Sequence, residues 1–403
     1  MITLPDILEI KPLKQPPHAT ITVPGSKSIT NRALILAALA DGKCTLRGAL
    51  WADDTQVMVD SLQRLGFEVN VSPDPAEECN RIIEVIGCGG KIPAKKADLF
   101  VGNAGTAARF ITAFVCLAHG EYKISGDPRM HERPMADLFE PLKSLGVDLD
   151  ETGNHLPVTI HANGMRGGTV SVSARRSSQF ASALMLISRW ATLDIVVSEP
   201  DEQHGYIEMT RRMIEEFQPD YLIEPDLSSA SYFLAINVVT GGQVVVAGWP
   251  RNSLQIDGRF PLYVPPPRIV SRLSDLGDSV MTLAICALFF KQPMQLTRAE
   301  RMRVQECDRL HAMVNELGKV GVCIKEHQDG FTVFPGYLGE LHGADIETYN
   351  DHRMAMCFSV LGLKIPGIRI KNPSCVSKTF PNFFDKLKQL GAELVDVKTG
   401  RPI

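Results

Sequence analysis

Residues 24–40 read Pro-Gly-Ser-Lys-Ser-Ile-Thr-Asn-Arg-Ala-Leu-Ile-Leu-Ala-Ala-Leu-Ala. A turn of small residues leads into an apolar run that begins at Ala33. Helix N-termini present unpaired backbone N–H groups and a partial positive charge. The stretch therefore predicts a buried helix whose first turn, with Lys27, Ser28 and Arg32, binds an anion. Taken alone, an ordinary helix cap at Ser26 or Ser28, with solvated charges, is the alternative.

The same half-unit recurs along the chain as a small or polar opener, an apolar helix rich in Ala and Leu, and a strand. Its six openers lie near Ser28, Gly105, Ser177, Ser228, Asp278 and Asn350. A second half-unit, an amphipathic helix followed by a glycine turn and a strand, recurs around Gly66, Gly146, Gly321 and Gly391. The third and fourth units are shorter than the others by roughly twenty residues each, and such repeats stack on a shared core. The pattern predicts a mixed α/β fold with buried helices inside and sheets outside.

Composition limits the possible classes of protein. A chain of 403 residues exceeds one ordinary core, so we expect two domains with three units each. A net charge of −4 gives no nucleic-acid footprint, and no apolar run reaches membrane-spanning length. The first residues show neither a signal nor a transit pattern. The nine cysteines are scattered without a Cys-x-x-Cys pair, which predicts reduced thiols in a cytoplasmic protein.

Polar residues gather at the openers of the repeated helices. Each group alone is compatible with a cap and surface charge, but their repetition predicts helix N-termini that converge on one site. The cations of that site would be Lys27, Arg32, Arg129, Arg309, Arg353 and Lys378, which suit a substrate with several anionic groups. Asp278 and Glu306 would repel such a ligand, so they are candidates for proton transfer. The alternatives are an N-cap for Asp278 and an ion pair with Arg303 or Arg309 for Glu306.

Six motifs occur in one order between Pro24 and Pro381. They are Pro24-Gly-Ser-Lys-Ser, Gly102-Asn-Ala-Gly-Thr, Gly126-Asp-Pro-Arg-Met-His-Glu-Arg-Pro, Asp308-Arg-Leu, Asn350-Asp-His-Arg-Met-Ala-Met and Ser377-Lys-Thr-Phe-Pro. As a set they resemble the 5-enolpyruvylshikimate-3-phosphate (EPSP) synthase family. The resemblance implies a two-domain, inside-out α/β barrel of βαβαββ repeats. The first domain would span residues 19–224, the second residues 1–18 with 225–403, and the active site would lie in the cleft between them.

The resemblance also implies a reaction. The family transfers the enolpyruvyl group of phosphoenolpyruvate to the 5-hydroxyl of shikimate 3-phosphate and releases phosphate, a step toward chorismate and the aromatic amino acids. No metal or organic cofactor is implied. The expected partners are these two small molecules, with inhibition by glyphosate, no nucleic acid and no membrane, and the expected state is a cytoplasmic monomer.

Site residues follow from the resemblance, motif by motif. Shikimate 3-phosphate would be held by Lys27, Ser28, Arg32, Ser177, Ser178, Gln179, Ser198, Tyr206, Asp278 and Gln305. Phosphoenolpyruvate would be held by Lys27, Asn103, Gly105, Arg129, Gln179, Arg309, Arg353 and Lys378. Asp278 would take the 5-hydroxyl proton and Glu306 would move the methylene proton, with Lys27 and His352 assisting phosphate departure.

Some positions depart from the family pattern. Gln305 stands where a lysine is usual, Phe110 replaces a usual proline, and an unusual segment precedes Tyr206. Two other functions are alternatives. One is a catalytically impaired, anion-binding relative. The other is the enolpyruvyl transferase that acts on UDP-N-acetylglucosamine, but its reactive loop cysteine has no counterpart here, since Cys116 lies earlier, in an apolar run.

Overall fold

The chain divides into two compact units in a computed structural model, which describes residues 2–198, 205–336 and 338–403. One unit is residues 25–224, and the other combines residues 1–24 with 225–403. The first boundary therefore lies between Pro24 and Gly25, not between residues 18 and 19. Strand β2 (His18–Ile21) explains the difference, because it pairs in parallel with β13 (Gln243–Val246) of the second unit.

The unit formed by residues 25–224 contains the first three repeats. In the first repeat, the strand order is β12-β3-β5-β4, and β12 from the end of the unit lies parallel to β3. Its elements are α1 (Lys27–Leu39), β3 (Asp41–Leu50), α2 (Asp53–Arg64), β4 (Val69–Pro73), β5 (Asn80–Cys88) and β12 (Asp220–Leu222). The second repeat has the order β6-β7-β9-β8. Its elements are β6 (Lys96–Phe100), α3 (Gly105–Val115), β7 (His119–Ser125), α4 (Ala136–Ser144), β8 (Asp148–Glu151) and β9 (Val158–Asn163).

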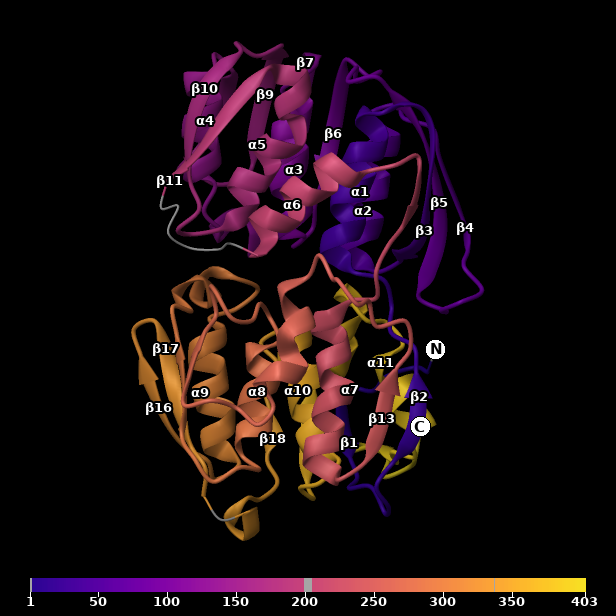
Figure 1. The fold of residues 1–403 in the computed structure, drawn as a ribbon, viewed down its shortest axis with the longest axis vertical. Coiled ribbons are helices and arrows are strands. Elements are labelled where there is room, and N and C mark those ends of the chain that lie inside the picture. The colour runs from indigo at the N-terminus through magenta and orange to yellow at the C-terminus, as the bar shows by residue number, and fades with distance from the viewer. Residues whose placement is uncertain (1, 199–204, 337) are drawn as a thin grey trace. The chain divides into compact units, whose positions relative to one another are not determined.

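The third repeat is shortened, as its spacing predicts. Its two strands form a separate parallel pair, and the chain leading to β12 replaces the antiparallel hairpin that ends the first, second and fifth repeats. The elements are β10 (Gly168–Ser173), α5 (Ser178–Ala191), β11 (Leu193–Ser198) and α6 (Gly205–Glu216). Helices α1, α3 and α5 contact one another, and the sheets lie outside them (Figure 1).

The other unit contains the fourth to sixth repeats. The fourth consists of the β2–β13 pair and α7 (Leu227–Thr240). A 3-10 helix at Ile256–Tyr263 takes the place of the amphipathic α-helix of the other repeats. The fifth repeat has the order β14-β15-β17-β16. Its elements are β14 (Ile269–Ser271), α8 (Val280–Ala287), β15 (Met294–Thr297), α9 (Arg309–Lys319), β16 (Cys323–His327) and β17 (Gly330–Phe334).

The sixth repeat closes the second unit with the order β18-β19-β1-β20. Strand β1 from the chain start lies antiparallel to both β19 and β20. Its elements are β1 (Ile7–Ile10), β18 (Asp345–Ile346), α10 (His352–Gly362), β19 (Ile368–Lys371), α11 (Phe383–Gln389) and β20 (Leu394–Asp396). Helices α7, α8 and α10 contact one another in this unit (Figure 1).

Apolar side chains explain why the inner helices are buried. Every residue of α3, α8 and α10 is buried, and α1 is buried from Ile29 onward. Burying an aliphatic or aromatic side chain stabilises a fold by about 1.5–3 kcal/mol. Helices α3, α8 and α10 are thus packed on all sides, which holds their N-terminal residues in place.

Candidate active site

At the start of α1 a lysine is held by a buried carboxylate. Lys27 Nζ lies 3.1 Å from Asp54 Oδ2 of α2, and their side chains are 14% and 4% exposed. Ser26 precedes the helix in an extended conformation, and its side chain makes no capping hydrogen bond. This contradicts the ordinary-cap alternative as far as it rests on Ser26. Sequence reasoning did not select Asp54, since an acidic residue in the first turn of a helix is common.

The starts of α3 and α5 are joined by polar contacts. Gln179 Nε2 donates to Thr106 Oγ1 at 3.2 Å, and Ser177 caps α5 by accepting from the Gln179 backbone N–H. Ser178 is buried beside them. Helices α3 and α5 thereby place two groups of predicted site residues next to each other.

Gly105, the first residue of α3, lies directly under an arginine. A Cβ at this position would approach Arg133 Nη2 to 2.5 Å. Arg133 Nη1 donates to both the carbonyl and the side-chain oxygen of Asn103, each at 3.2 Å. Arg133 belongs to a quoted motif, but sequence reasoning gave it no role. Its guanidinium occupies the space that a Cβ at position 105 would take, so a side chain there would displace it.

Arg32 is almost fully buried, and neutral groups surround it. Its guanidinium donates to Thr210 Oγ1 at 2.7 Å, to the Ser28 carbonyl at 3.0 Å and to Ser182 Oγ at 3.1 Å. It also donates to the Tyr206 carbonyl at 3.3 Å. Burial lowers the pKa of Arg32 to about 10. Phe110, at the unusual position, packs 5.2 Å from this guanidinium.

Three other predicted residues of this unit lie in more open surroundings. Arg129 Nη1 pairs with Glu132 at 2.6 Å and its side chain is 37% exposed. Ser28 is partly buried, and Ser198 Oγ donates to the Val172 carbonyl at 3.3 Å. The segment before Tyr206 that departs from the family pattern includes residues 199–204, which lie outside the described residues.

In the other unit Asp278 is surrounded by arginines. Its carboxylate lies 2.6 Å from Arg272 Nη2, 2.8 Å from Arg353 Nη2 and 3.6 Å from Arg309 Nη1. It is not an N-cap, because Ser279 occupies that position before α8. Arg272 was absent from the sequence-based set, and no motif pointed to it.

Arg309 connects this carboxylate to two more. It contacts Glu306 Oε2 at 3.0 Å and Asp351 Oδ2 at 2.7 Å, and its Nη1 donates to Gln305 Oε1 at 2.8 Å. Burial lowers the pKa of the Arg309 guanidinium, but the fields of Asp351, Glu306 and Asp278 outweigh it and raise the pKa above its ordinary value. Arg309 is therefore a permanent buried cation. The ion pair of Glu306 with Arg309, which the sequence offers as the alternative to proton transfer, is present.

Asp351 was quoted within a motif but assigned no function. It is fully buried and caps α10 by accepting from the Arg353 backbone N–H at 2.9 Å. His352 begins α10, is also fully buried, and has Nδ1 3.7 Å from Asp351 Oδ1. Arg353 Nη1 contacts Tyr232 Oη at 3.4 Å, and Lys378 is buried at the end of the 3-10 helix Pro373–Lys378. The start of α10 thus presents a cap, an imidazole and a guanidinium within three residues.

The predicted residues fall into two groups, one in each unit. The group of residues 25–224 is cationic and polar, and the group of the other unit holds carboxylates among arginines.

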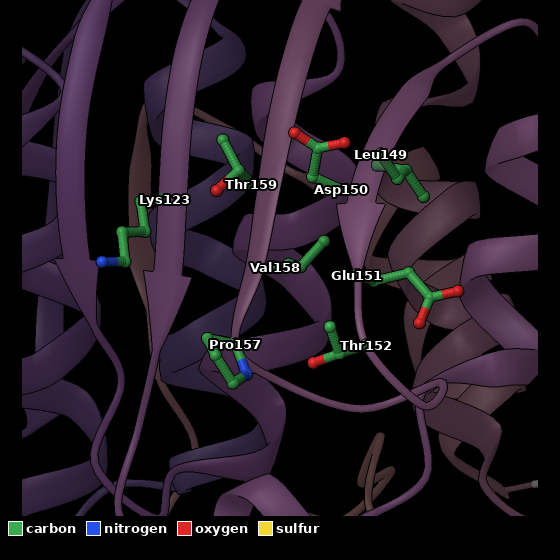
Figure 2. A pocket seen from close by; sticks show the side chains of 8 residues that line it. All are labelled: Lys123, Leu149, Asp150, Glu151, Thr152, Pro157, Val158 and Thr159. Carbon is green, nitrogen blue, oxygen red and sulfur yellow. The ribbon is translucent and has the colours of Figure 1, made fainter.

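Within the described residues, no cluster of His, Cys, Asp and Glu suits a metal ion. A recess on strands β7–β9, lined by residues such as Lys123, Asp150 and Glu151, contains none of the predicted residues (Figure 2). Among the helices described, none is long and apolar enough to cross a membrane.

Comparison with solved structures identifies the fold. EPSP synthase from Acinetobacter baumannii matches with a TM-score of 0.75 at 23% identity, covering 96% of this chain and 99% of that one. The enolpyruvyl transferase NikO from Streptomyces tendae matches with a TM-score of 0.72 at 13% identity, covering 97% and 99%. The chain therefore has the two-domain fold of the enolpyruvyl transferases.

Sequence comparison narrows this class to one family. The model of the EPSP synthase (3-phosphoshikimate 1-carboxyvinyltransferase) family matches residues 13–220, 218–262 and 267–387. The 3-phosphoshikimate 1-carboxyvinyltransferase of Nostoc punctiforme is 38% identical, covering 96% of this chain and 99% of that protein. That of Vibrio atlanticus is 37% identical, covering 95% and 99%. The chain belongs to the EPSP synthase family.

Proposed function

We propose that this chain is a 3-phosphoshikimate 1-carboxyvinyltransferase. It transfers the enolpyruvyl group of phosphoenolpyruvate to the 5-hydroxyl of shikimate 3-phosphate, in the shikimate pathway. The observation that carries the proposal is the network of Asp278, Glu306, Arg309, Asp351 and Arg353. It sets two carboxylates able to move protons among cations able to hold a polyanion.

Addition is the first half of the reaction. The oxygen of the 5-hydroxyl forms a bond to C2 of phosphoenolpyruvate while Asp278 accepts the hydroxyl proton. Glu306 donates a proton to C3, which converts the double bond into a methyl group and gives a tetrahedral intermediate. Arg309, Arg353 and Lys378 hold the anionic groups of phosphoenolpyruvate, together with Lys27, Asn103, Gly105, Arg129 and Gln179. Fixed cations of this kind stabilise charge without reorganisation.

Elimination completes the transfer. The bond from C2 to the phosphate oxygen breaks, Glu306 removes a proton from C3, and the double bond forms again. Lys27 and His352 assist the departing phosphate. Shikimate 3-phosphate stays bound by Lys27, Ser28, Arg32, Ser177, Ser178, Gln179, Ser198, Tyr206, Asp278 and Gln305. Holding both reactants in place supplies the proximity that the addition requires.

Release of inorganic phosphate from phosphoenolpyruvate, with and without shikimate 3-phosphate, tests this function. We expect release only when both substrates are present. Glu306→Gln should lower kcat by about 10²–10⁴, because it removes the group that moves the C3 proton. Glu326→Gln is the matched control. Glu326 lies partly exposed on β16 and pairs with Arg303 and His311, so kcat should change by less than about twofold.

Two outcomes would contradict the proposal. No phosphate release by a folded protein would favour the catalytically impaired, anion-binding relative. Release that depends on UDP-N-acetylglucosamine would favour the other transferase.

The proposal extends to inhibition by glyphosate in competition with phosphoenolpyruvate, and to a cytoplasmic monomer. The nine free cysteines support a reducing compartment.

A further inference from the structure

A buried glutamate lies two turns along α9 from Arg309. The Glu316 side chain is fully buried, and Lys319 Nζ approaches both of its carboxylate oxygens at 2.8 Å. The Glu347 backbone N–H donates to Oε2 at 3.0 Å, and Tyr349 Oη donates to Oε1 at 2.8 Å. A buried carboxylate is tolerated when its oxygens accept several hydrogen bonds, and Glu316 accepts them from three residues. Two of the three donor residues belong to the segment that leads into α10, although none of the reaction steps uses Glu316.

That segment has an unusual backbone. Tyr349 and Asn350 are consecutive non-glycine residues with φ of 53° and 55°, in the left-handed region. Such residues persist only where the surroundings hold them, and they concentrate at functional sites. Two side-chain contacts hold this pair. Tyr349 donates to Glu316, and Asn350 Oδ1 accepts from Asn372 Nδ2 at 3.0 Å.

The next residues are the ones that the reaction needs. Asp351 follows immediately, and its backbone N–H donates to the Thr348 carbonyl at 2.8 Å, which closes the turn. Asp351 then binds Arg309 and caps α10, whose Arg353 pairs with Asp278. Helix α9 therefore contacts this segment twice, through Arg309 to Asp351 and through Glu316 to Tyr349. Residues 309 and 316 are about two helical turns apart on one face.

We propose that Glu316 and Tyr349 are positioning residues for phosphoenolpyruvate. Their hydrogen bond holds the left-handed pair, and the pair sets where Asp351 and Arg353 stand relative to Arg309. Neither residue touches the reacting atoms. The inference rests on the proposed function, because Arg309 and Arg353 are assigned there to phosphoenolpyruvate. It adds two residues to that site that no motif analysis selected.

Tyr349→Phe is the direct test, since it removes one hydroxyl and keeps the ring. We expect KM for phosphoenolpyruvate to rise about tenfold, the effect of one hydrogen bond to a charged group. The Kd for shikimate 3-phosphate alone should stay within about twofold, because most of its proposed ligands lie in residues 25–224. Glu316→Gln keeps an oxygen that accepts from Tyr349, so it should retain more phosphoenolpyruvate affinity than Glu316→Leu.

Tyr122→Phe is the matched control. Tyr122 is fully buried in β7, and its hydroxyl donates to the Ala94 carbonyl at 2.6 Å. Tyr122→Phe should lower the thermal midpoint about as much as Tyr349→Phe does. It should leave KM for phosphoenolpyruvate and Kd for shikimate 3-phosphate within about twofold of the wild-type values. The proposal is overturned if Tyr349→Phe leaves KM for phosphoenolpyruvate unchanged, if both substrates weaken equally, or if Tyr122→Phe has the same effect.

A binding measurement separates this inference from the proposed function. Phosphoenolpyruvate should raise the thermal midpoint of the wild-type protein more than that of Tyr349→Phe. A wild type that shows this difference but no turnover would contradict the proposed function and support the positioning role. Equal rises in the two proteins would contradict the positioning role, whether or not turnover occurs.

Discussion

Arg309 owes its buried charge to three carboxylates, of which Asp351 is the most deeply buried. Asp351 accepts two hydrogen bonds from Arg309 and one from the Arg353 backbone. A buried charge is tolerated only when it is paired and hydrogen-bonded in this way. One side chain therefore fixes both a helix start and a cation of the proposed phosphoenolpyruvate site.

Asp351→Asn separates these two roles. Asparagine caps helices as well as aspartate does, so α10 should keep its start. The Arg309 guanidinium loses its nearest negative charge, and the free energy of unfolding should fall by about 3 kcal/mol. KM for phosphoenolpyruvate should rise at least tenfold. Denaturant unfolding and steady-state kinetics measure the two effects. An unchanged stability would show that Glu306 and Asp278 suffice for Arg309.

Tyr221 and Tyr349 are among the tyrosines that should titrate late in the folded protein, since burial also raises the pKa of Tyr122, Tyr232 and Tyr263. Burial raises the pKa of Tyr221 to about 12, and burial with the hydrogen bond to Glu316 raises the pKa of Tyr349 to about 12. Their ordinary pKa is 10.0. Between these values the folded state binds more protons than the unfolded state, so stability should fall as pH rises from about 10 to about 12.

Ultraviolet titration of tyrosinate absorbance measures this directly. Tyr349→Phe and Tyr221→Phe should each remove one late-titrating group. If Tyr349 titrates near pH 10 in the folded wild type, its contact with Glu316 is absent in solution.

At the scale of elements, the four glycine turns after the outer helices share one conformation. Gly66, Gly146, Gly321 and Gly391 have φ of 87°, 85°, 91° and 92°. Each follows the last helical residues of α2, α4, α9 or α11, where a left-handed residue satisfies the free carbonyls. In the sequence, a glycine that recurs directly after Leu or Val predicts these turns. The structure confirms all four of them.

Helix α9 offers a matched pair of glycines. A Cβ at Gly318, inside the helix, would meet no atom within 4 Å. Gly318→Ala should stabilise the protein by about 0.5–1 kcal/mol, because alanine loses less backbone entropy in a helix. Gly321→Ala should destabilise it by at least about 1 kcal/mol, because its φ is left-handed and a Cβ would lie 3.0 Å from the Glu340 carbonyl. Chemical denaturation should give shifts of opposite sign; shifts of the same sign would contradict the assigned backbone of this turn.

The inner helices were predictable because each combines a polar opener with an apolar run. Openers near Ser28, Gly105, Ser177, Ser228, Asp278 and Asn350 correspond to helices that begin at Lys27, Gly105, Ser178, Leu227, Val280 and His352. Asp54, Arg272 and the Glu316–Tyr349 contact were not predictable. The residues involved are common polar types, and each has its partner on another element or segment of the chain. No local pattern reports such a distant pairing.

At the scale of the whole molecule, sheet closure uses strands far away in the sequence. β12 completes the sheet that begins with β3, and β1 completes the sheet of β19 and β20. The repeat period predicted the modules, but local sequence could not show which remote strand fills each edge. The boundary that the resemblance implies, between residues 18 and 19, runs through β2, whereas the compact units divide between Pro24 and Gly25.

Residues 25–224 form a continuous segment with their own buried helices, so they should fold when produced alone. Ending the segment at residue 216 removes β12 and exposes the edge of β3, which should lower the thermal midpoint. Circular dichroism and thermal melts of the two fragments measure this. If the longer fragment has no cooperative transition, the unit depends on the rest of the chain.

The reaction that we propose for this chain joins the enolpyruvyl group of phosphoenolpyruvate to the 5-hydroxyl of shikimate 3-phosphate. Nuclear magnetic resonance of the reaction mixture tests it most directly, because it identifies the atom that receives the group. We predict that the enolpyruvyl group appears on the 5-oxygen, with one phosphate released for each product formed. Phosphoenolpyruvate that stays intact, or is hydrolysed to pyruvate without a shikimate product, would contradict the account.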